Sequence, residues 1–292
     1  MIPHGLKTFI ATQYGIITQH KFGIFGAVII IFFGVVGLFG PMIAPHGPWE
    51  TLRDASGKLA LLQPPSWEFP LGTTALGRDI LSQMLYATRT TVVIGLVSGL
   101  ISILIGANIG LISGYYGGKL DEFLMRFTDI VYGMPFLPFL IVLIALFGRS
   151  FWFVIIAICC IVWRTSARVI RAQTMAIKQR QFILAGKARG CSDLRIIYGH
   201  IMPNIMPLLL LYTAFNIAWS VLAEAGASFL GFGDPDNLSW GGMLYNLWIS
   251  GKIRTAWWWF APPAICIVLL VSALVFVSRA YEEEANPRLK QR

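Results

Sequence analysis

Residues 22–43 read FGIFGAVIIIFFGVVGLFGPMI, a run of 22 residues without a charged side chain. An α-helix rises about 1.5 Å per residue, so about 20 apolar residues cross the roughly 30 Å hydrocarbon core of a bilayer. The run therefore predicts a transmembrane helix. It does not fit a cleavable signal peptide, because it is too long and no small-residue cleavage pattern precedes the proline-rich segment that follows.

Five more apolar runs of similar length follow, at 91–115, 127–148, 151–170, 203–230 and 258–280. The whole chain is 56% hydrophobic and 13% charged, with a mean hydropathy of +0.68, whereas about a quarter of the residues in a soluble domain are charged. This composition excludes an ordinary soluble enzyme and a disordered chain. The net charge of +9 is spread between the apolar runs, so no nucleic-acid partner is predicted. The predicted fold class is all-α: a polytopic protein of the cell membrane, with six transmembrane helices in the lipid bilayer.

The Lys and Arg residues between the runs predict the orientation. With the N-terminus in the cytoplasm, 16 of them fall in cytoplasmic segments and 7 in outer segments, which is the bias that the positive-inside rule requires. Both termini are therefore expected in the cytoplasm. The predicted organisation is a tail over 1–21, a transmembrane domain over 22–280 with an outer loop (44–90) and an inner loop (171–202), and a second tail over 281–292.

Motifs for catalysis and metal binding are missing from the sequence. There is no GxxxxGK[ST] loop for ATP and no HExxH motif, and the four histidines have no metal-ligand spacing. The four cysteines are expected to be structural, because two are helix neighbours and one lies in a reducing compartment. We therefore predict no catalytic residue, no metal site and no cofactor bound by this chain.

The inner loop contains FILAGKARGCSDLRIIYGHIMPNIMP at 182–207. The pattern predicts two short amphipathic helices that are separated at Gly190, with Ser192 capping the second. Leu194, Ile197 and Ile201 would form one apolar face, too short to span a membrane. Such a helix either lies on the bilayer surface, which composition alone favours, or docks into a groove of a partner protein.

This segment resembles the EAA loop of binding-protein-dependent ABC importer permeases. Ala185, Gly190 and Pro203 match that pattern, whereas Leu184 replaces its Glu and Gly186 its second Ala. In that family the loop forms a coupling helix that fits a groove on the ATPase subunit. The resemblance implies that the coupling residues are Ala185, Gly186, Gly190, Asp193, Leu194, Ile197, Ile201 and Pro203.

Two further stretches are similar to signatures of the dipeptide/oligopeptide/nickel subfamily, and to its C-type permease in particular. They are LGTTALGRDILSQMLYATRTTVVIG at 71–95, where Thr74 replaces the usual Asp, and ASFLGFGDPDNLSWGGML at 227–244. The outer-face residues that carry the resemblance are Gly72, Gly77, Arg78, Asp79, Ser239 and Trp240.

The resemblance implies a type I ABC importer permease. Its partners would be a second permease in a heterodimer, two ATPase subunits that bind ATP and Mg, and an extracytoplasmic solute-binding protein. Peptides are the expected substrate, with nickel complexes or oligosaccharides as alternatives. An ATPase-independent channel or carrier, or a sensory subunit that moves no solute, remains open.

Two features within the runs are ambiguous. Glycines recur at Gly95, Gly99, Gly106, Gly110 and Gly114. This spacing favours close helix packing inside the subunit over a face that slides against the partner permease. Glu224 is an ionisable group at membrane depth, and it either lines the translocation pathway or is satisfied by the loop after it.

Charged residues and prolines near the inner ends of the runs are candidates for a gate. Arg126 and Asp129 are three residues apart, which favours a structural ion pair over a gate role. Pro135 and Pro138 each remove a helix hydrogen bond, so a kink beside the pathway is expected. The stripe of Arg164, Arg168 and Arg171 is interpreted as a positive-inside anchor rather than a substrate site.

Overall fold

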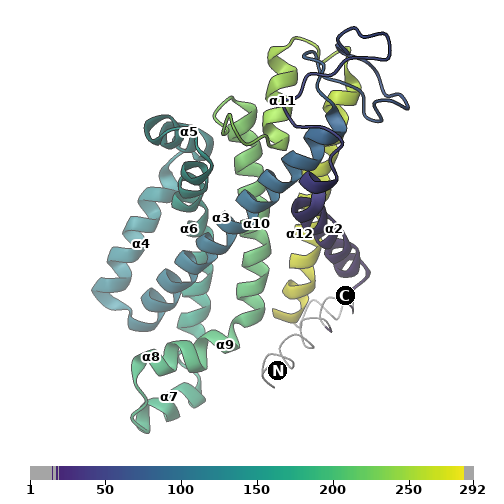
Figure 1. Cartoon of the computed structure of the whole chain (residues 1–292). Helices are drawn as coiled ribbons and strands as arrows, with labels where there is room; N and C mark the ends of the chain where they lie inside the picture. Colours follow the sequence, from purple (N-terminus) through teal and green to yellow (C-terminus); the bar gives the residue numbers. More distant parts are fainter. Residues whose placement is uncertain (1–14, 16–17, 19, 286–292) are drawn as a thin grey trace.

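The computed structural model describes residues 15, 18 and 20–285, with side chains up to residue 282. Most of the predicted tail 1–21, and residues 286–292 of the predicted tail 281–292, lie outside the described residues. The helices are α2 (Lys21–Ile43), α3 (Ile80–Tyr116), α4 (Gly118–Gly133), α5 (Phe136–Phe147), α6 (Phe151–Ile177), α7 (Gln181–Ala188), α8 (Asp193–Ile196), α9 (Met202–Asn204), α10 (Met206–Phe229), α11 (Trp240–Ile249) and α12 (Trp257–Ala285), as Figure 1 shows. A π-helical turn, Ile197–Ile201, joins α8 to α9.

Five of these helices, α2, α3, α6, α10 and α12, are long and apolar enough to cross a membrane. The remaining predicted span, 127–148, which is the third in chain order, is divided between α4 and α5, and these two helices meet at a bend of 92°. The two helices together are apolar enough to count as one broken span, and the expected kink is found at Pro135. The cause is local, because proline lacks a backbone N–H and pushes the residue before it out of the helical region; Met134 accordingly has a ψ of 130°.

Helix α3 forms the centre of the packing and crosses the molecule diagonally between α6 and α10 (Figure 1). Its glycines permit this. A Cβ atom at Gly99 would lie 2.7 Å from the backbone nitrogen of Ile217 on α10, and one at Gly110 would lie 2.6 Å from the carbonyl oxygen of Ala167 on α6. Such distances exclude any side chain, so the glycine stripe is used for packing within this subunit, as predicted.

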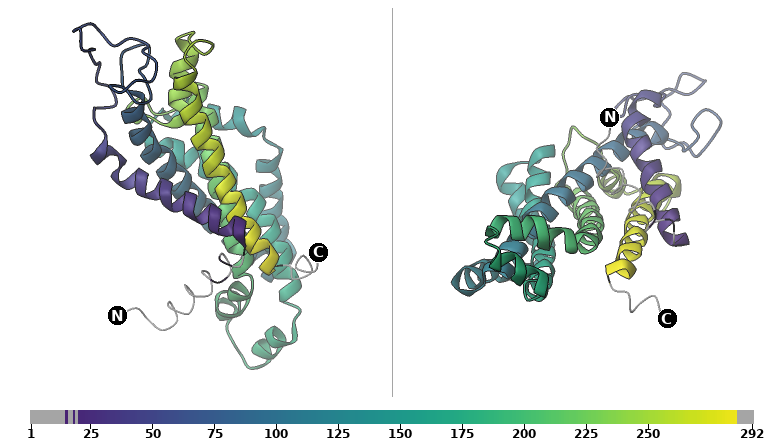
Figure 2. Two further views of the ribbon diagram at one scale, coloured as in Figure 1. Left: turned by 90° about the vertical axis from the view of Figure 1, so that its right-hand side faces the viewer. Right: turned by 90° about the horizontal axis from the view of Figure 1, so that it is seen from below.

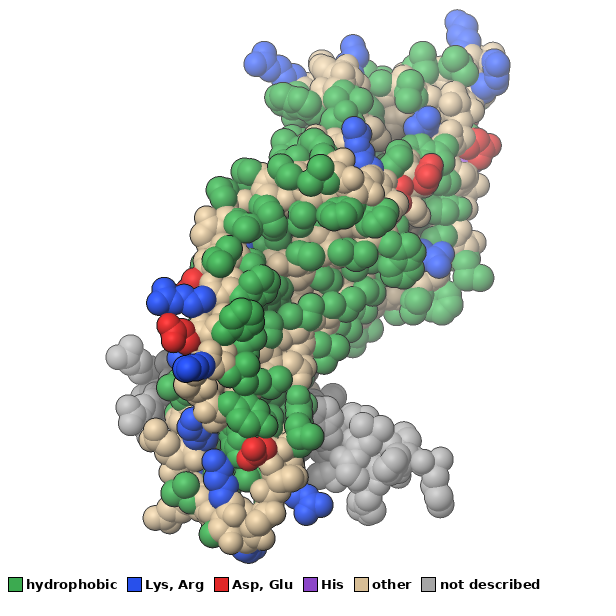
Figure 3. All heavy atoms as spheres, turned by 90° about the vertical axis from the view of Figure 1, so that its left-hand side faces the viewer, with side chains coloured by type: hydrophobic (Ala, Val, Ile, Leu, Met, Phe, Trp, Pro, Cys, Tyr) green, Lys and Arg blue, Asp and Glu red, His purple; other side chains and the backbone are tan. Residues whose placement is uncertain are grey.

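Hydrophobic side chains cover much of the surface. Helix α2 leaves Phe22, Leu38 and Met42 at least two-thirds exposed, while Gly26 packs on α12 and Gly40 on α3. On the face drawn in Figure 3, hydrophobic side chains cover the middle of the molecule and most Lys and Arg lie toward its two ends. This is the surface that a bilayer requires.

The two ends of the molecule are built differently. One end, the loop end, carries residues 44–79, 230–239 and α11, and the opposite end, the α7 end, carries α7–α9 (Figure 2). Helix α2 begins and α12 finishes toward the α7 end (Figure 1). The irregular outer loop is shorter than the predicted 44–90, because α3 begins at Ile80.

Candidate functional site

The coupling segment comprises residues 181–205 and begins with α7. Helix α7 is terminated before Gly190. Gly190 has a φ of +79°, a region where glycine avoids the steric cost of a Cβ atom. Its N–H bonds to the Lys187 carbonyl, and the Cys191 N–H bonds to the Gly186 carbonyl. These two bonds form a Schellman motif, so Gly190 fixes the angle at which α8 leaves α7.

One side of the coupling segment is buried against its own chain. Ile183, Ile196, Ile197 and Ile201 are fully buried, in a cluster with Leu111 and Tyr115 of α3 and Ile170 and Ile177 of α6. The expectation that Ile197 and Ile201 share a free docking face with Leu194 is therefore wrong. Leu194 is 65% exposed and lies on the other side.

The π-helical turn begins at Ile197, after Leu194. Its N–H to carbonyl bond runs from Met202 to Ile197, five residues back, so it holds more residues per turn than an α-helix. The division between Leu194 and Ile197 lies before this turn and follows from the packing of Ile197 against α3 and α6. Pro203, which has no N–H to donate, follows the turn. The Asn204 side-chain amide donates to the His200 carbonyl at 2.6 Å.

Tyr115, at the end of α3, fastens the coupling segment to the rest of the chain. Its hydroxyl donates to the Asp193 carboxylate at 2.5 Å, and the Lys187 ammonium lies 4.7 Å from its ring centre. Lys178 donates to the carbonyls of Gly114 and Tyr115 at 3.2 and 3.0 Å. Ser192 stands at the N-cap of α8 as predicted, but its side chain makes no capping bond.

The opposite side of the coupling segment is exposed and mixed in character. Phe182, Leu184 and Leu194 are 46–65% exposed. The other exposed residues of this segment include Ala185, Arg189, Arg195 and Pro203, and Arg180, which directly precedes the segment, is exposed as well, whereas Gly186 is buried. No ion pair joins the three arginines to a described residue. An apolar surface with basic neighbours is thus left free on a segment whose other side is held.

Ion pairs near the α7 end differ from the predicted ones. Arg126 pairs with Glu122 at 3.7 Å, and Asp129 pairs with Arg168 of α6 rather than with Arg126. Arg171 holds the Asp121 carboxylate through two bonds of 2.6 Å. The i, i+3 pair proposed for Arg126 and Asp129 is wrong, because tertiary packing brings α6 beside α4.

A cavity of about 440 Å³ lies between the α4–α5 bend, α6 and α10, and we call it the aromatic cavity. It is lined by Tyr132, Phe136, Ile161, Val162, Arg164, Thr165, Tyr212, Phe215, Asn216 and Trp219. Phe136 and Trp219 stack edge-to-face across it with ring centres 6.1 Å apart. The bend at Pro135 places Phe136 here, so Pro135 is next to the cavity although it is not in its lining.

Sequence reasoning did not find the aromatic cavity. Tyr212, Phe215, Asn216 and Trp219 are spaced at i, i+3, i+4 and i+7 on α10, which places them on one helix face. That spacing was a usable signal. The aromatic face was not recognised because hydropathy alone identified this run as a span, and hydropathy does not distinguish aromatic from aliphatic residues.

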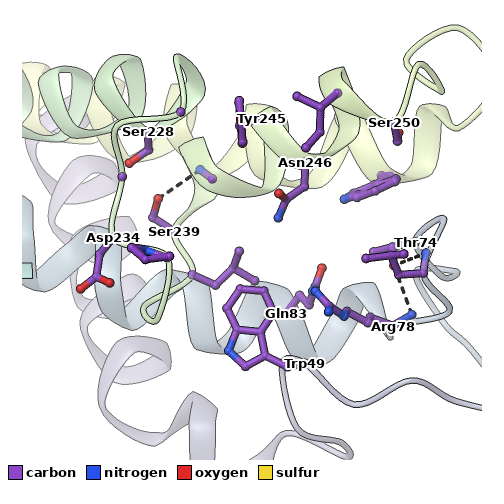
Figure 4. Close-up of a pocket in the computed structure, with 18 of the residues that line it drawn as sticks. Trp49, Thr74, Arg78, Gln83, Ser228, Asp234, Ser239, Tyr245, Asn246 and Ser250 are labelled. Atoms are coloured by element: carbon purple, nitrogen blue, oxygen red, sulfur yellow. Dashed lines mark hydrogen bonds between the residues drawn. The ribbon is translucent and has the colours of Figure 1, made fainter. Parts of the chain in front are cut away.

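A second cavity, of about 450 Å³, lies at the loop end, and Figure 4 shows the side chains around it. Arg78 lies in its wall with its guanidinium carbon 4.9 Å from the ring centre of Trp49. Its Nε has no hydrogen-bond partner among the described residues. Burial lowers the pKa of Arg78, because a low-dielectric surrounding disfavours the charged form.

The other signature residues of the loop end serve its architecture. Asp79 caps α3 by accepting from the Ser82 N–H at 2.8 Å, and Ser239 caps α11 by accepting from the Gly242 N–H at 3.1 Å. Trp240 is fully buried. Gly72 and Gly77 have positive φ angles, and a Cβ at Gly72 would lie 2.7 Å from the ring of Trp258.

Glu224 lies inside the chain and lines neither cavity. It is 1% exposed, and its Oε1 accepts from the Ser228 hydroxyl at 2.6 Å. The hydroxyls of Thr91 on α3 and Ser239 are its other polar neighbours. Its Oε2 has no hydrogen-bond partner among the described residues, so the carboxyl group is bonded on one oxygen only, and the pathway role of Glu224 stays a prediction.

The chain matches two family models. Residues 106–291 match the model described as binding-protein-dependent transport system inner membrane component, and residues 17–65 match the N-terminal TM domain of oligopeptide transport permease C.

Relatives and one solved structure agree with these matches. The dipeptide transport system permease protein DppC of Bacillus subtilis is 30% identical over 94% of this chain and 84% of its own length. The oligopeptide transport system permease protein OppC of Haemophilus influenzae is 32% identical over 90% and 82%. A structure of the MetNI methionine ABC transporter has a TM-score of 0.56 at 18% identity, covering 70% of this chain and 95% of that one, and so shares the fold.

Proposed function

The chain belongs to the family of binding-protein-dependent transport system inner membrane components. From this premise we propose the other subunits of its transporter and the class of substrate that the transporter imports. It is a permease subunit of an ABC importer. In our proposal it pairs with a second permease and with two ATPase subunits that bind ATP and Mg. A solute-binding protein delivers peptides to the loop end, which faces outward, while the termini and the α7 end face the cytoplasm.

The orientation is supported by the charge distribution. The predicted cytoplasmic segments hold 16 of the 23 Lys and Arg residues, or 15 when Arg164, which lies in the middle of α6, is set aside, and the exposed arginines of the coupling segment are among them. Peptides are proposed as cargo because the relatives that match over most of their length carry dipeptide and oligopeptide transport in their names.

The observation that carries the proposal is the two-sided coupling segment. Its buried isoleucines and the Tyr115–Asp193 bond tie it to α3 and α6, whereas Leu184 and Leu194 remain exposed. When a partner protein bound to the exposed side moves, the coupling segment moves the ends of α3 and α6 in the same direction. ATP binding in the ATPase subunits can thereby shift the permease between two states.

The test is recovery of the ATPase subunits with the purified chain. A central apolar contact is worth about 2 kcal/mol or more, so Leu194→Asp is expected to lower the recovery by about tenfold or more. The matched control is Leu61→Asp, a residue of similar exposure at the loop end, which is expected to leave the recovery unchanged. Full recovery with Leu194→Asp would reject the docking surface.

A further inference from the structure

The aromatic cavity contains a charged residue at membrane depth. Arg164 is the central residue of the 27-residue helix α6, 13 residues from Phe151 and 13 from Ile177. This places it about 20 Å along the helix from either end. A charge at such a depth is costly unless it faces protein, water or a ligand, so it is a candidate functional residue.

Arg164 differs from the other two arginines on its side of α6. Arg168 and Arg171 each hold a carboxylate, from Asp129 and Asp121. Arg164 has no ion-pair partner among the described residues, and its single hydrogen bond, to the Val131 carbonyl, is long at 3.5 Å. Its guanidinium lies 4.9 Å from the ring centre of Tyr132 and 5.7 Å from that of Phe136. The rings partly stabilise the charge and leave its hydrogen-bonding groups available.

The rest of the cavity complements this charge. Its walls carry aromatic rings from three helices, and Trp219 is 55% exposed. Besides Arg164, its polar groups are few. Asn216 donates to the Ser166 hydroxyl at 3.4 Å, the hydroxyls of Thr165 and Tyr132 are hydrogen-bonded to each other at 3.2 Å, and Tyr212 adds a third hydroxyl. The volume of about 440 Å³ lies in the range of small-molecule sites, which are mostly apolar with a few placed polar groups.

We propose that the aromatic cavity is a transient binding site for the peptide in transit, in which Arg164 binds a peptide carboxylate and the aromatic walls hold apolar side chains. This inference rests on the proposed import of peptides. Every unmodified peptide has a C-terminal carboxylate, which matches the planar fork of a guanidinium. Aromatic walls accept side chains of different shape, so the site binds peptides without strict sequence selection.

The test uses the complete transporter in vesicles, with radiolabelled Ala-Phe-Ala delivered by the binding protein. A hydrogen bond to a charged group contributes about 1.5–3 kcal/mol, so Arg164→Gln is expected to lower import by about tenfold or more. Arg164→Lys keeps the charge and is expected to recover part of it. ATP hydrolysis driven by the loaded binding protein is expected to persist in both variants, because the coupling segment is intact.

Two controls separate this site from a general loss of charge or of an aromatic ring. Lys119→Gln removes an exposed charge on α4, and Trp152→Ala removes a tryptophan that is 66% exposed outside the cavity. Both are expected to import normally. Trp219→Ala is the second variant at the site, expected to lower import by about fivefold or more, and it is used if Arg164→Gln fails to assemble with the ATPase subunits.

A photoreactive peptide, Ala-benzoylphenylalanine-Ala, adds a direct readout. It is expected to label α6 or α10 of this chain in the wild type and not in Arg164→Gln. If Arg164→Gln and Trp219→Ala both import normally while the wild type imports peptide, the cavity is a packing defect or a lipid site and this inference is wrong. If the wild type imports no peptide, the proposed function fails instead.

Discussion

The loop end and the α7 end both carry sequence signatures, but they use them differently. At the loop end, Asp79 and Ser239 cap helices and Trp240 fills the core. At the α7 end, the matching residues Ala185, Gly190 and Pro203 are all exposed, on a segment whose unmatched residues are divided between buried Ile197 and exposed Leu194. Shared residues at the loop end therefore specify an architecture, whereas those at the α7 end lie on an exposed surface.

The strongest way to test the architectural role of the loop end is Trp240→Ala. Trp240 is fully buried and packs edge-to-face on Phe33 at 5.2 Å, so its removal is expected to cost about 3–5 kcal/mol of stability. Thermal unfolding of the purified transporter measures the loss. Trp240→Phe is the control: the indole N–H has no partner among the described residues, so no hydrogen bond is lost, and a smaller decrease is expected.

At the α7 end, the pair Ile197→Ala and Leu194→Ala separates the two sides of the coupling segment. Ile197→Ala leaves a cavity in a buried cluster and is expected to cost about 2–4 kcal/mol of stability. Leu194→Ala is expected to change the thermal unfolding by less than about 0.5 kcal/mol and to weaken ATPase recovery instead. Equal effects of the two variants on stability would contradict the division.

How far the sequence predicts this structure depends on the range of the interaction. Apolar runs predicted five spans correctly, because few other structures can satisfy a backbone in lipid, and Pro135 predicted the kink through its own covalent geometry. The partner of Asp129 could not be found, since Arg168 reaches it only through the packing of α6 on α4.

The coupling segment shows a second limit. The spacing of Leu194, Ile197 and Ile201 predicted one face, but packing against α3 and α6 buries Ile197 and Ile201 and leaves Leu194 exposed. The aromatic cavity shows a third, because its walls come from α4, α5, α6 and α10 and no single segment contains it. The sequence predicted which residues form each helix, but it did not predict which side chains from different helices meet in one cavity.

The contact between α3 and the coupling segment can be weakened while the buried isoleucines and the exposed leucines of the segment are left in place. Tyr115→Phe deletes the hydroxyl that donates to Asp193 and is expected to cost about 1–2 kcal/mol, since the bond is to a charged group but is partly exposed. Because the docking surface remains, ATPase recovery is expected to persist while transport per ATP hydrolysed falls. Tyr116→Phe is the control, since this neighbouring tyrosine of α3 is 49% exposed and no hydrogen bond joins its hydroxyl to another described residue. Unchanged coupling in Tyr115→Phe would contradict the fastening role.

The smallest expected effects compare the N-caps of the two ends. Asp79 accepts from the N–H and the hydroxyl of Ser82, so Asp79→Ala is expected to lower stability by about 1 kcal/mol. Ser192 occupies the same position before α8 but makes no capping bond, so Ser192→Ala is expected to change stability by less than about 0.5 kcal/mol. Thermal unfolding of the two variants side by side measures the difference. A larger loss at Ser192 than at Asp79 would mean that the α7 end depends on its caps as the loop end does, and the contrast between the two ends would then lie only in their exposed surfaces.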